Sequence, residues 1–258
     1  MDLHLNEPLE AILYHGPTQK ARVITEGWTA ANLYCPVCGE PHLTQFEASR
    51  PVADFYCEHC GAQFEQKSIK KKPSHLPRKI TGSGYEAMLD RLKSDDNPHL
   101  LLLYHKDGMI NTLVLIPKFF FTSSIVEKRK PTWPKGRSKE WIGSYIWLEG
   151  IPECGKVFII KDGVPEDQDK VLALYRKTLP LKTGDLESTG WLLDILNCVE
   201  RIGTSTFSLS QIYAFEPDLK KNHPGNSHIK DKIRQQLQVL RDKGFVEFDS
   251  RGRYRRLV

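Results

Sequence analysis

Apolar and polar positions along the first 180 residues follow patterns that predict both strands and helices. The runs HLLLLYH (99–105) and NTLVLIP (111–117) are mostly apolar, and the turn signal Lys106-Asp107-Gly108 separates them. Short apolar runs bounded by turn residues are typical of strands in the interior of a sheet. The runs WIGSYIWL (141–148) and KVFIIKDG (156–163) predict two more strands.

Helical spacing occurs in three other segments of this region. Segment 18–28 places Val23, Ile24 and Trp28 on one side, and segments 84–93 and 167–178 read as amphipathic helices. Helices and buried strands in this mixture predict an α/β (α+β) fold. We therefore expect residues 1–180 to form one domain around a mostly buried sheet.

The pattern changes after a linker-like segment, TLPLKTGDLES (178–188). Residues 189–203 have the spacing of an apolar helix, and residues 206–215 read as a short strand and a helix with a capping-box pair, Ser208 and Gln211. A third helix covers 226–244, and residues 245–257 form a hairpin around a glycine turn. This order predicts a winged helix domain over residues 181–258.

Charge and composition narrow the class of protein. The chain has 258 residues and a net charge of +5, which is compatible with a polyanionic partner. No apolar run approaches the ~20 residues that a membrane span needs. The start, MDLHLNEPLEAIL, lacks the pattern of a signal peptide. We expect a cytoplasmic protein without a membrane partner.

Four of the six cysteines form two pairs with metal-binding spacing. Cys35-Pro-Val-Cys38-Gly and Cys57-Glu-His-Cys60-Gly are separated by 18 residues. Without an export signal, such pairs favour metal over disulfide, and four thiolates match structural Zn²⁺. The alternative is a chance pairing of reduced cysteines. We expect neither metal-binding nor catalysis from the remaining cysteines and nearby histidines, which are Cys154, Cys198, His42 and His59.

Three charged residues flank the second pair. Asp54 precedes it, and Glu65-Gln66-Lys67 follows, in a D-x₁₀-E-x-K pattern. Strand alternation puts Glu65 and Lys67 on one face. Two carboxylates suit Mg²⁺, and the ammonium can serve an attacking water, which is the PD-(D/E)xK nuclease arrangement. The alternative is that these three residues are solvated surface charges. The apolar residues that flank them argue against it, and a zinc knuckle would hold the connection between Asp54 and Glu65 in place.

The last two elements carry residues suited to DNA. We expect the outward face of the third tail helix to present Lys230, Arg234, Gln235 and Gln238, of which arginine and glutamine contact base edges in the major groove. The hairpin offers phosphate contacts from Arg251, Arg253, Tyr254, Arg255 and Arg256. The alternatives are a winged helix that contacts another protein and a basic face that is merely solvated.

The order of these motifs resembles the DpnI-type family of methyl-directed restriction endonucleases. The segments that carry the resemblance are RPVADFYC (50–57), FEQKS (64–68), WIG (141–143), ILNC (195–198), HIKDKIRQQLQVLRDK (228–243) and RGRYR (251–255). They run almost from end to end, and the segment 228–243 is the most specific. Segment 73–83 and the middle strands match less closely, which leaves the register of sequence-reading residues open there.

The resemblance implies an endonuclease that cuts double-stranded GATC when its adenine is N6-methylated. It implies a PD-(D/E)xK domain with a built-in zinc site and a winged helix that reads the same sequence again. By the matching motifs, Asp54, Glu65 and the main-chain carbonyl of Gln66 would bind Mg²⁺, and Lys67 would serve the water. Trp141 of the WIG motif would lie near the DNA, although a core tryptophan is the alternative. We expect a monomer in a bacterial cytoplasm.

One methyl group supplies only ~1 kcal/mol of burial. A steep preference for methylated DNA therefore makes more sense with two reading domains than with one. Two other functions stay open. One is a zinc and winged-helix DNA reader or regulator without activity, which has no need of Asp54, Glu65 and Lys67. The other is a repair or structure-selective nuclease on the same fold, which would ignore methylation.

Overall fold

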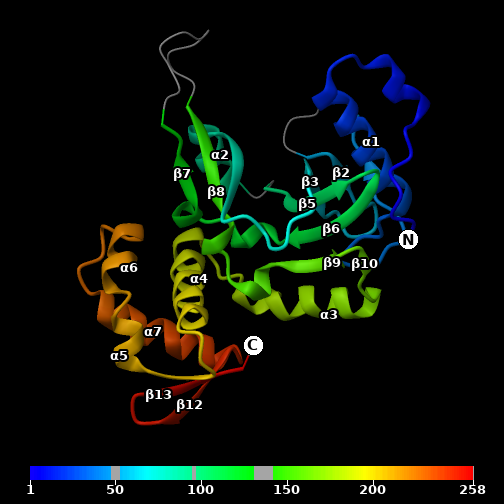
Figure 1. Ribbon diagram of the computed structural model, residues 1–258. Helices are drawn as coiled ribbons and strands as arrows, with labels where there is room; N and C mark the ends of the chain where they lie inside the picture. The colour runs from blue at the N-terminus through cyan, green and yellow to red at the C-terminus, as the bar shows by residue number, and fades with distance from the viewer. Residues whose placement is uncertain (48–52, 95–96, 131–141, 258) are drawn as a thin grey trace. The chain divides into compact units, whose positions relative to one another are not determined.

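The structure is a computed structural model of the chain, and it describes residues 1–47, 53–94, 97–130 and 142–257 (Figure 1). It contains two compact units. One comprises residues 1–76, 95–118 and 155–178, and the other comprises residues 77–94, 119–154 and 179–258. The described helices include none with the length and apolar character to cross a bilayer.

The first unit is built on a seven-stranded mixed sheet. Strands β3 and β5 pair in parallel, and the other neighbours are antiparallel. In sheet order the strands are β1 (Thr44–Gln45), β2 (Phe55–Tyr56), β3 (Gln63–Lys70), β5 (His99–Lys106), β6 (Met109–Ile116), β9 (Val157–Lys161) and β10 (Val164–Pro165).

The predicted central hairpin is confirmed. Strands β5 and β6 are buried along nearly their whole length, and Asp107 and Gly108 join them with positive φ angles of 53° and 73°. Two consecutive positive φ angles give the tight turn that matches the twist of antiparallel strands, which explains the Asp-Gly pair. The apolar runs therefore form the centre of the sheet.

The α-helices in the described part of this unit are α1 (Pro17–Asn32) and α3 (Gln168–Thr178). Helix α3 packs against β9, as Figure 1 shows, and buries Val171 and Tyr175 in the core. Helix α1 differs from the prediction: Trp28 is buried as expected, but Val23 and Ile24 are only half-buried. The helix instead buries three polar residues, Thr25, Glu26 and Thr29.

The second unit holds a separate three-stranded sheet in the order β4 (Lys79–Gly84), β8 (Gly143–Trp147) and β7 (Val126–Lys128), with helix α2 (Tyr85–Leu92) beside it. The expectation of a single sheet for residues 1–180 is therefore wrong for the strand within 141–148. That strand pairs with β4, whose Ile80 lies opposite Ile146. Its half-buried Tyr145 and Trp147 do not suit the centre of the main sheet.

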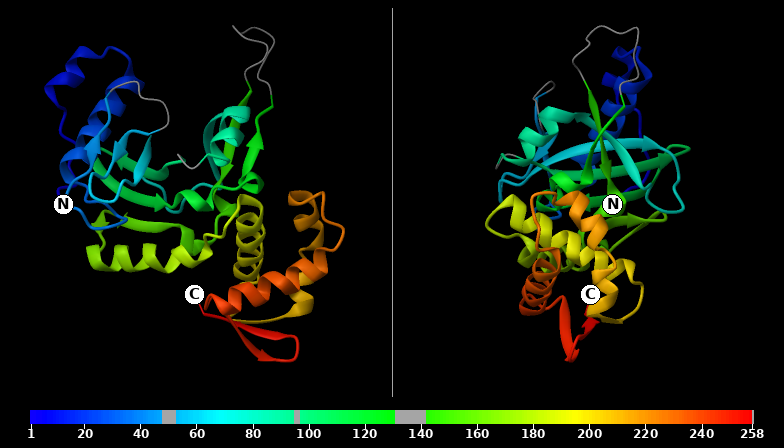
Figure 2. Two further views of the ribbon diagram at one scale, coloured as in Figure 1. Left: turned by 180° about the vertical axis from the view of Figure 1, so that it is seen from behind. Right: turned by 90° about the vertical axis from the view of Figure 1, so that its left-hand side faces the viewer.

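The tail folds in the order expected of a winged helix. Its elements are α4 (Leu186–Arg201), β11 (Thr206–Ser208), α5 (Leu209–Tyr213), α6 (Glu216–Asn222), α7 (Ile229–Asp242), β12 (Val246–Ser250) and β13 (Arg253–Arg256). Ser208 and Gln211 form the predicted capping box at the start of α5. Strand β11 joins the hairpin in the order β11-β13-β12, and the hairpin follows α7 in both views of Figure 2.

Helix α6 was not predicted, and a buried polar cluster fixes its end. The Asp194 carboxylate on α4 accepts hydrogen bonds from Asn222 at 3.0 Å and from the ring of His223 at 2.9 Å. It also accepts one from Ser124 at 3.0 Å. The His223 ring stacks on Trp191 with 3.7 Å between ring centroids. Because the buried carboxylate has several donors, its burial is compensated by hydrogen bonds.

Candidate active site and metal centre

The two cysteine pairs form two knuckles with the same backbone geometry. In the first, the N–H of Gly39 donates to the carbonyl of Cys35 at 2.8 Å; in the second, the N–H of Gly61 donates to the carbonyl of Cys57 at 2.9 Å. Gly39 and Gly61 have positive φ angles of 91° and 72°. Glycine adopts this conformation without the strain that a side chain brings, which is why each pair is followed by glycine.

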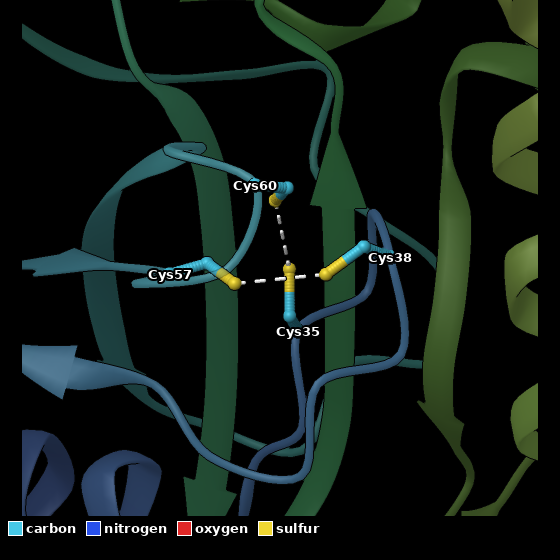
Figure 3. Close-up of side chains that lie close together, drawn as sticks. All are labelled: Cys35, Cys38, Cys57 and Cys60. Atoms are coloured by element: carbon cyan, nitrogen blue, oxygen red, sulfur yellow. Dashed lines mark hydrogen bonds between the residues drawn. The ribbon is translucent and has the colours of Figure 1, made fainter.

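The four thiols point toward one another (Figure 3). The sulfur of Cys35 is 3.7 Å from that of Cys60, and the sulfur of Cys38 is 3.6 Å from that of Cys57. All four sulfurs lie within 4.8 Å of one another. Zinc bound tetrahedrally at ~2.3 Å from each sulfur requires sulfurs ~3.8 Å apart. The cluster therefore fits a structural zinc ion and leaves no open position for a substrate.

Burial raises the pKa of the Cys35 thiol, and it raises the pKa of the Cys60 thiol to about 11. Without metal, these two sulfurs keep their protons at neutral pH. Zinc binding then releases protons, because the ion is held by thiolates. His42 and His59 are both exposed.

Asp54 lies beside the free edge of β3, just beyond the end of β2. Its backbone N–H donates to the carbonyl of Phe64 at 2.8 Å, and its Oδ2 accepts from the N–H of Gln66 at 2.7 Å. Burial raises the pKa of Asp54, and the charge of Glu65 adds to this, while the Gln66 hydrogen bond opposes it. The structure thus brings Asp54 to the strand that carries the other predicted residues.

Glu65 and Lys67 lie on one face of β3, as strand alternation predicts. The Lys67 ammonium is 3.0 Å from Glu65 Oε1, and each side chain is about a quarter exposed, at 26% and 25%. This partial burial leaves both groups open to a ligand. The two residues form an ion pair that a bound cation or phosphate would have to rearrange.

Gln66 connects the strand to Asp54 through its backbone and to α1 through its side chain. The N–H and C=O of a strand residue point to the same neighbouring strand. Because the Gln66 N–H points to Asp54, its carbonyl faces the same edge. Its side-chain Oε1 accepts from Thr29 Oγ1 at 2.5 Å. Glu65 lies close enough for its charge to act on Asp54. The oxygens of Asp54, Glu65 and the Gln66 carbonyl form a donor set that suits a hard divalent cation.

A cavity of ≈ 290 Å³ opens beside Asp54, and two of its lining residues, Arg22 and Glu26, were not among the predicted site residues. Glu26 Oε2 accepts from Gln45 at 2.9 Å, and Arg22 Nε lies 3.6 Å from the other oxygen. Burial and then the charge of Asp54 raise the pKa of Glu26 to about 7. Helical residues with polar side chains on a buried face were the available signal.

The predicted reading face of α7 is exposed at all four positions, Lys230, Arg234, Gln235 and Gln238. Two of these cations already have partners. Lys230 lies 3.5 Å from Glu216, and Arg234 donates to Tyr213 Oη at 2.9 Å and forms an ion pair with Asp231. These partners hold the long side chains in place over the helix surface.

The hairpin presents Arg251 and Arg253 to solvent, whereas Tyr254 is half-buried. The Tyr254 ring stacks on Phe207 with 5.5 Å between centroids and meets Phe248 edge-on at 6.0 Å. This packing stabilises the three-stranded sheet, so that Tyr254 has a structural role in addition to any contact with DNA. Trp141 lies outside the described residues.

Two segments of the chain match models of known families. Residues 1–184 match the model DpnI, described as the Dam-replacing family, and residues 187–256 match DpnI_C, described as the Dam-replacing HTH domain. The chain belongs to the Dam-replacing family. In general terms, the family is one of methyl-dependent restriction enzymes, and its helix-turn-helix domain indicates DNA binding. The mixed α/β unit, the winged helix order and the four-cysteine cluster agree with this membership.

Proposed function

We propose that this protein is a Mg²⁺-dependent type II endonuclease that hydrolyses double-stranded DNA at GATC sites containing N6-methyladenine. The observation that carries the proposal is the hydrogen bond between Asp54 and the Gln66 N–H, which places a carboxylate against the strand that carries Glu65 and Lys67. The membership in the Dam-replacing family supports the substrate.

The arrangement follows the PD-(D/E)xK pattern. Asp54, Glu65 and the main-chain carbonyl of Gln66 would hold the ion. A bound Mg²⁺ lowers the pKa of a coordinated water and offsets charge that develops on the phosphate. Lys67, released from Glu65, would orient the attacking water and donate to the phosphate oxygens on which charge develops. The zinc knuckle between Asp54 and Glu65 keeps the two like charges at a set separation.

Two parts of the chain are assigned to reading the site. We assign catalysis and a first reading step to residues 1–180, with Trp141 near the DNA, and a second reading step to the winged helix, residues 181–258. The latter would use Lys230, Arg234, Gln235 and Gln238 on α7, and Arg251, Arg253 and Tyr254 on the hairpin. The enzyme would act as a monomer in the bacterial cytoplasm.

A zinc-containing winged-helix protein that reads methylated DNA without cutting it is the second candidate. The exposed face of α7 favours it as much as it favours the nuclease. The ordered Asp54, Glu65 and Lys67 arrangement favours the nuclease, because a reader needs no such cluster.

A cleavage assay separates these functions. One plasmid is prepared with and without adenine methylation at GATC and is incubated with Mg²⁺ and either the unmodified protein or Asp54→Ala. We expect discrete fragments from methylated plasmid with the unmodified protein alone. Binding of methylated DNA without cutting by either protein would establish the reader. Cutting of both plasmids would keep the nuclease and remove the methylation requirement.

A further inference from the structure

Helix α1 carries two buried threonines one turn apart, and their hydroxyls have different partners. Thr25, at 1% exposure, bonds within its own helix, with Oγ1 lying 2.9 Å from the carbonyl of Ala21. Thr29, at 0% exposure, has Oγ1 3.1 Å from the carbonyl of Thr25 and 2.5 Å from Gln66 Oε1. Of this pair, Thr29 is the one that links α1 to strand β3.

The contact between Thr29 and Gln66 is a hydrogen bond in either of two arrangements. A hydroxyl has one proton to donate and can also accept. In the first arrangement, Thr29 donates to the side-chain oxygen of Gln66. In the second, it donates to the main-chain carbonyl of Thr25 and accepts from the side-chain NH₂ of Gln66. Within the described residues, the Gln66 amide nitrogen is buried and has no hydrogen-bond partner in the first arrangement. Thr29 is therefore the anchor of this side chain in both.

Gln66 is the residue whose backbone meets Asp54. Its N–H donates to Asp54 Oδ2 at 2.7 Å, and its carbonyl faces the same edge of the strand. A shift of the Gln66 backbone would therefore disturb both the hydrogen bond to Asp54 and the direction of the carbonyl. A Gln66 side chain that is anchored to α1 resists such a shift.

We propose that Thr29 is a positioning residue of the nuclease site, which holds Gln66 so that its N–H and carbonyl are directed to Asp54 and the bound cation. The proposal rests on the proposed function of the same site. Thr29 is buried at 0% exposure and takes no part in the chemical step. Partners that orient a metal ligand typically change metal affinity or activity by roughly 10–100-fold when they are removed.

Three substitutions in the full-length protein test this role. Thr29→Val removes the hydroxyl and keeps the shape, and Thr29→Ser keeps the hydroxyl. Thr25→Val is the matched control, because it makes the same change at a buried position of the same helix where, within the described residues, the hydroxyl bonds only to carbonyls of that helix. Each protein is measured in single-turnover cleavage of methylated plasmid over a range of Mg²⁺ concentrations. The rise in melting temperature with added Mg²⁺ gives a second readout that needs no cleavage.

We expect Thr29→Val to raise the half-saturating Mg²⁺ concentration or lower the cleavage rate by roughly 10–100-fold and to weaken the Mg²⁺-dependent rise in melting temperature. Thr29→Ser should restore both, and Thr25→Val should behave as the unmodified protein. Equal Mg²⁺ dependence in Thr29→Val and Thr25→Val would overturn the proposal. So would a serine variant as impaired as the valine variant, because packing of the methyl group would then explain the loss.

If Thr29→Val does not fold, Gln66→Met removes the same contact from the strand side, and the same shift in Mg²⁺ dependence is expected. An unshifted Mg²⁺ dependence in Gln66→Met would overturn the role. The proposed function can fail by itself. If the unmodified protein binds Mg²⁺ but does not cut methylated plasmid, it is not the proposed nuclease. The melting measurement then decides whether Thr29 positions Gln66. An unmodified protein that shows neither cleavage nor a Mg²⁺ effect would overturn both.

Discussion

The backbone N–H of Gln66 lies 2.7 Å from Oδ2 of Asp54, so that a carboxylate from before the second cysteine pair is fixed to the strand after it. Ten residues and one zinc knuckle lie between the partners of D-x₁₀-E in the sequence, yet Asp54 and Glu65 interact electrostatically in the fold. The hydrogen bond also opposes the effect of burial on the pKa of Asp54, which favours the ionised form that a cation needs.

Replacing Lys67 with methionine should abolish most of the cleavage activity. The ammonium 3.0 Å from Glu65 is lost, and with it a donor for the charge that develops on phosphate. Loss of one such donor lowers kcat by about 10²–10³-fold. The measurement is single-turnover cleavage of methylated plasmid, with DNA binding followed in parallel. Lys70→Met, at an exposed position on the same strand, is the control. Equal rates for the two variants would rule out the role of Lys67.

Removing zinc should inactivate the protein without any change in the catalytic residues. Cys38→Ser leaves three thiolates, and the loop that carries Asp54 loses its anchor. We expect a protein with less bound zinc, a lower melting temperature and little cleavage. Metal analysis, thermal unfolding and the plasmid assay check these outcomes. Cys154→Ser should retain the zinc content of the unmodified protein. Full cleavage by a zinc-free protein would show that the knuckle does not position the carboxylates.

Replacing Arg234 with alanine should weaken binding to methylated GATC. A lost bidentate base contact costs about 1–3 kcal/mol, whereas a lost phosphate contact lowers the salt dependence of binding with little change in sequence preference. The measurement is the dissociation constant for methylated and unmethylated duplexes at several salt concentrations, in the Asp54→Ala background. Arg241→Ala is the control, because Arg241 is also exposed on α7 and is not one of the predicted reading residues. Equal affinities for both variants would remove Arg234 from the reading face.

His99 should make the stability of the first unit depend on pH. Burial, with the charge of Lys118 adding to it, lowers the pKa of His99 from 6.5 to about 3. The unfolded chain therefore binds one proton more than the folded chain between these two pH values, so stability falls as the pH falls through 6.5 toward 3. One proton corresponds to ~1.4 kcal/mol for each pH unit.

The free energy of unfolding by denaturant, measured from pH 7 to pH 4.5, checks this prediction. In His99→Gln, the free energy of unfolding should fall less steeply as the pH falls, by a slope that corresponds to up to one proton. His75→Gln, which changes an exposed histidine, should leave the slope as it is in the unmodified protein. The same slope in the unmodified protein and His99→Gln would show that His99 is not held neutral in the folded state.

Local spacing was enough to predict the cysteine knuckles, the central hairpin and the capping box. In each of them the partners lie within a few residues of one another, as Cys57 and Cys60 do, so the pattern carries the geometry. The winged helix was predictable for a similar reason, because its apolar periodicity and its turn glycines follow one another along the chain. Helix α6 was missed because its seven residues bury a single leucine, Leu219.

Contacts between segments that are distant in the sequence could not be predicted. Nothing local to Trp147 shows that its strand pairs with Lys79 in a separate sheet. The buried face of α1 could not be found from hydrophobic spacing either, because Thr25 and Thr29 are buried by polar contacts with the helix backbone and with Gln66. Arg22 and Glu26 were overlooked for the same reason.

The short connection between Asp54 and Glu65 has to satisfy two geometries at once. Cys57 and Cys60 need the spacing that closes a knuckle around a metal, and the flanking carboxylates need the spacing that meets at the edge of β3. An insertion or deletion in this connection would disturb both together, so tolerance to length changes should be lowest here of all the loops of this sheet. Evolution could then vary the residues of this connection far more easily than their number.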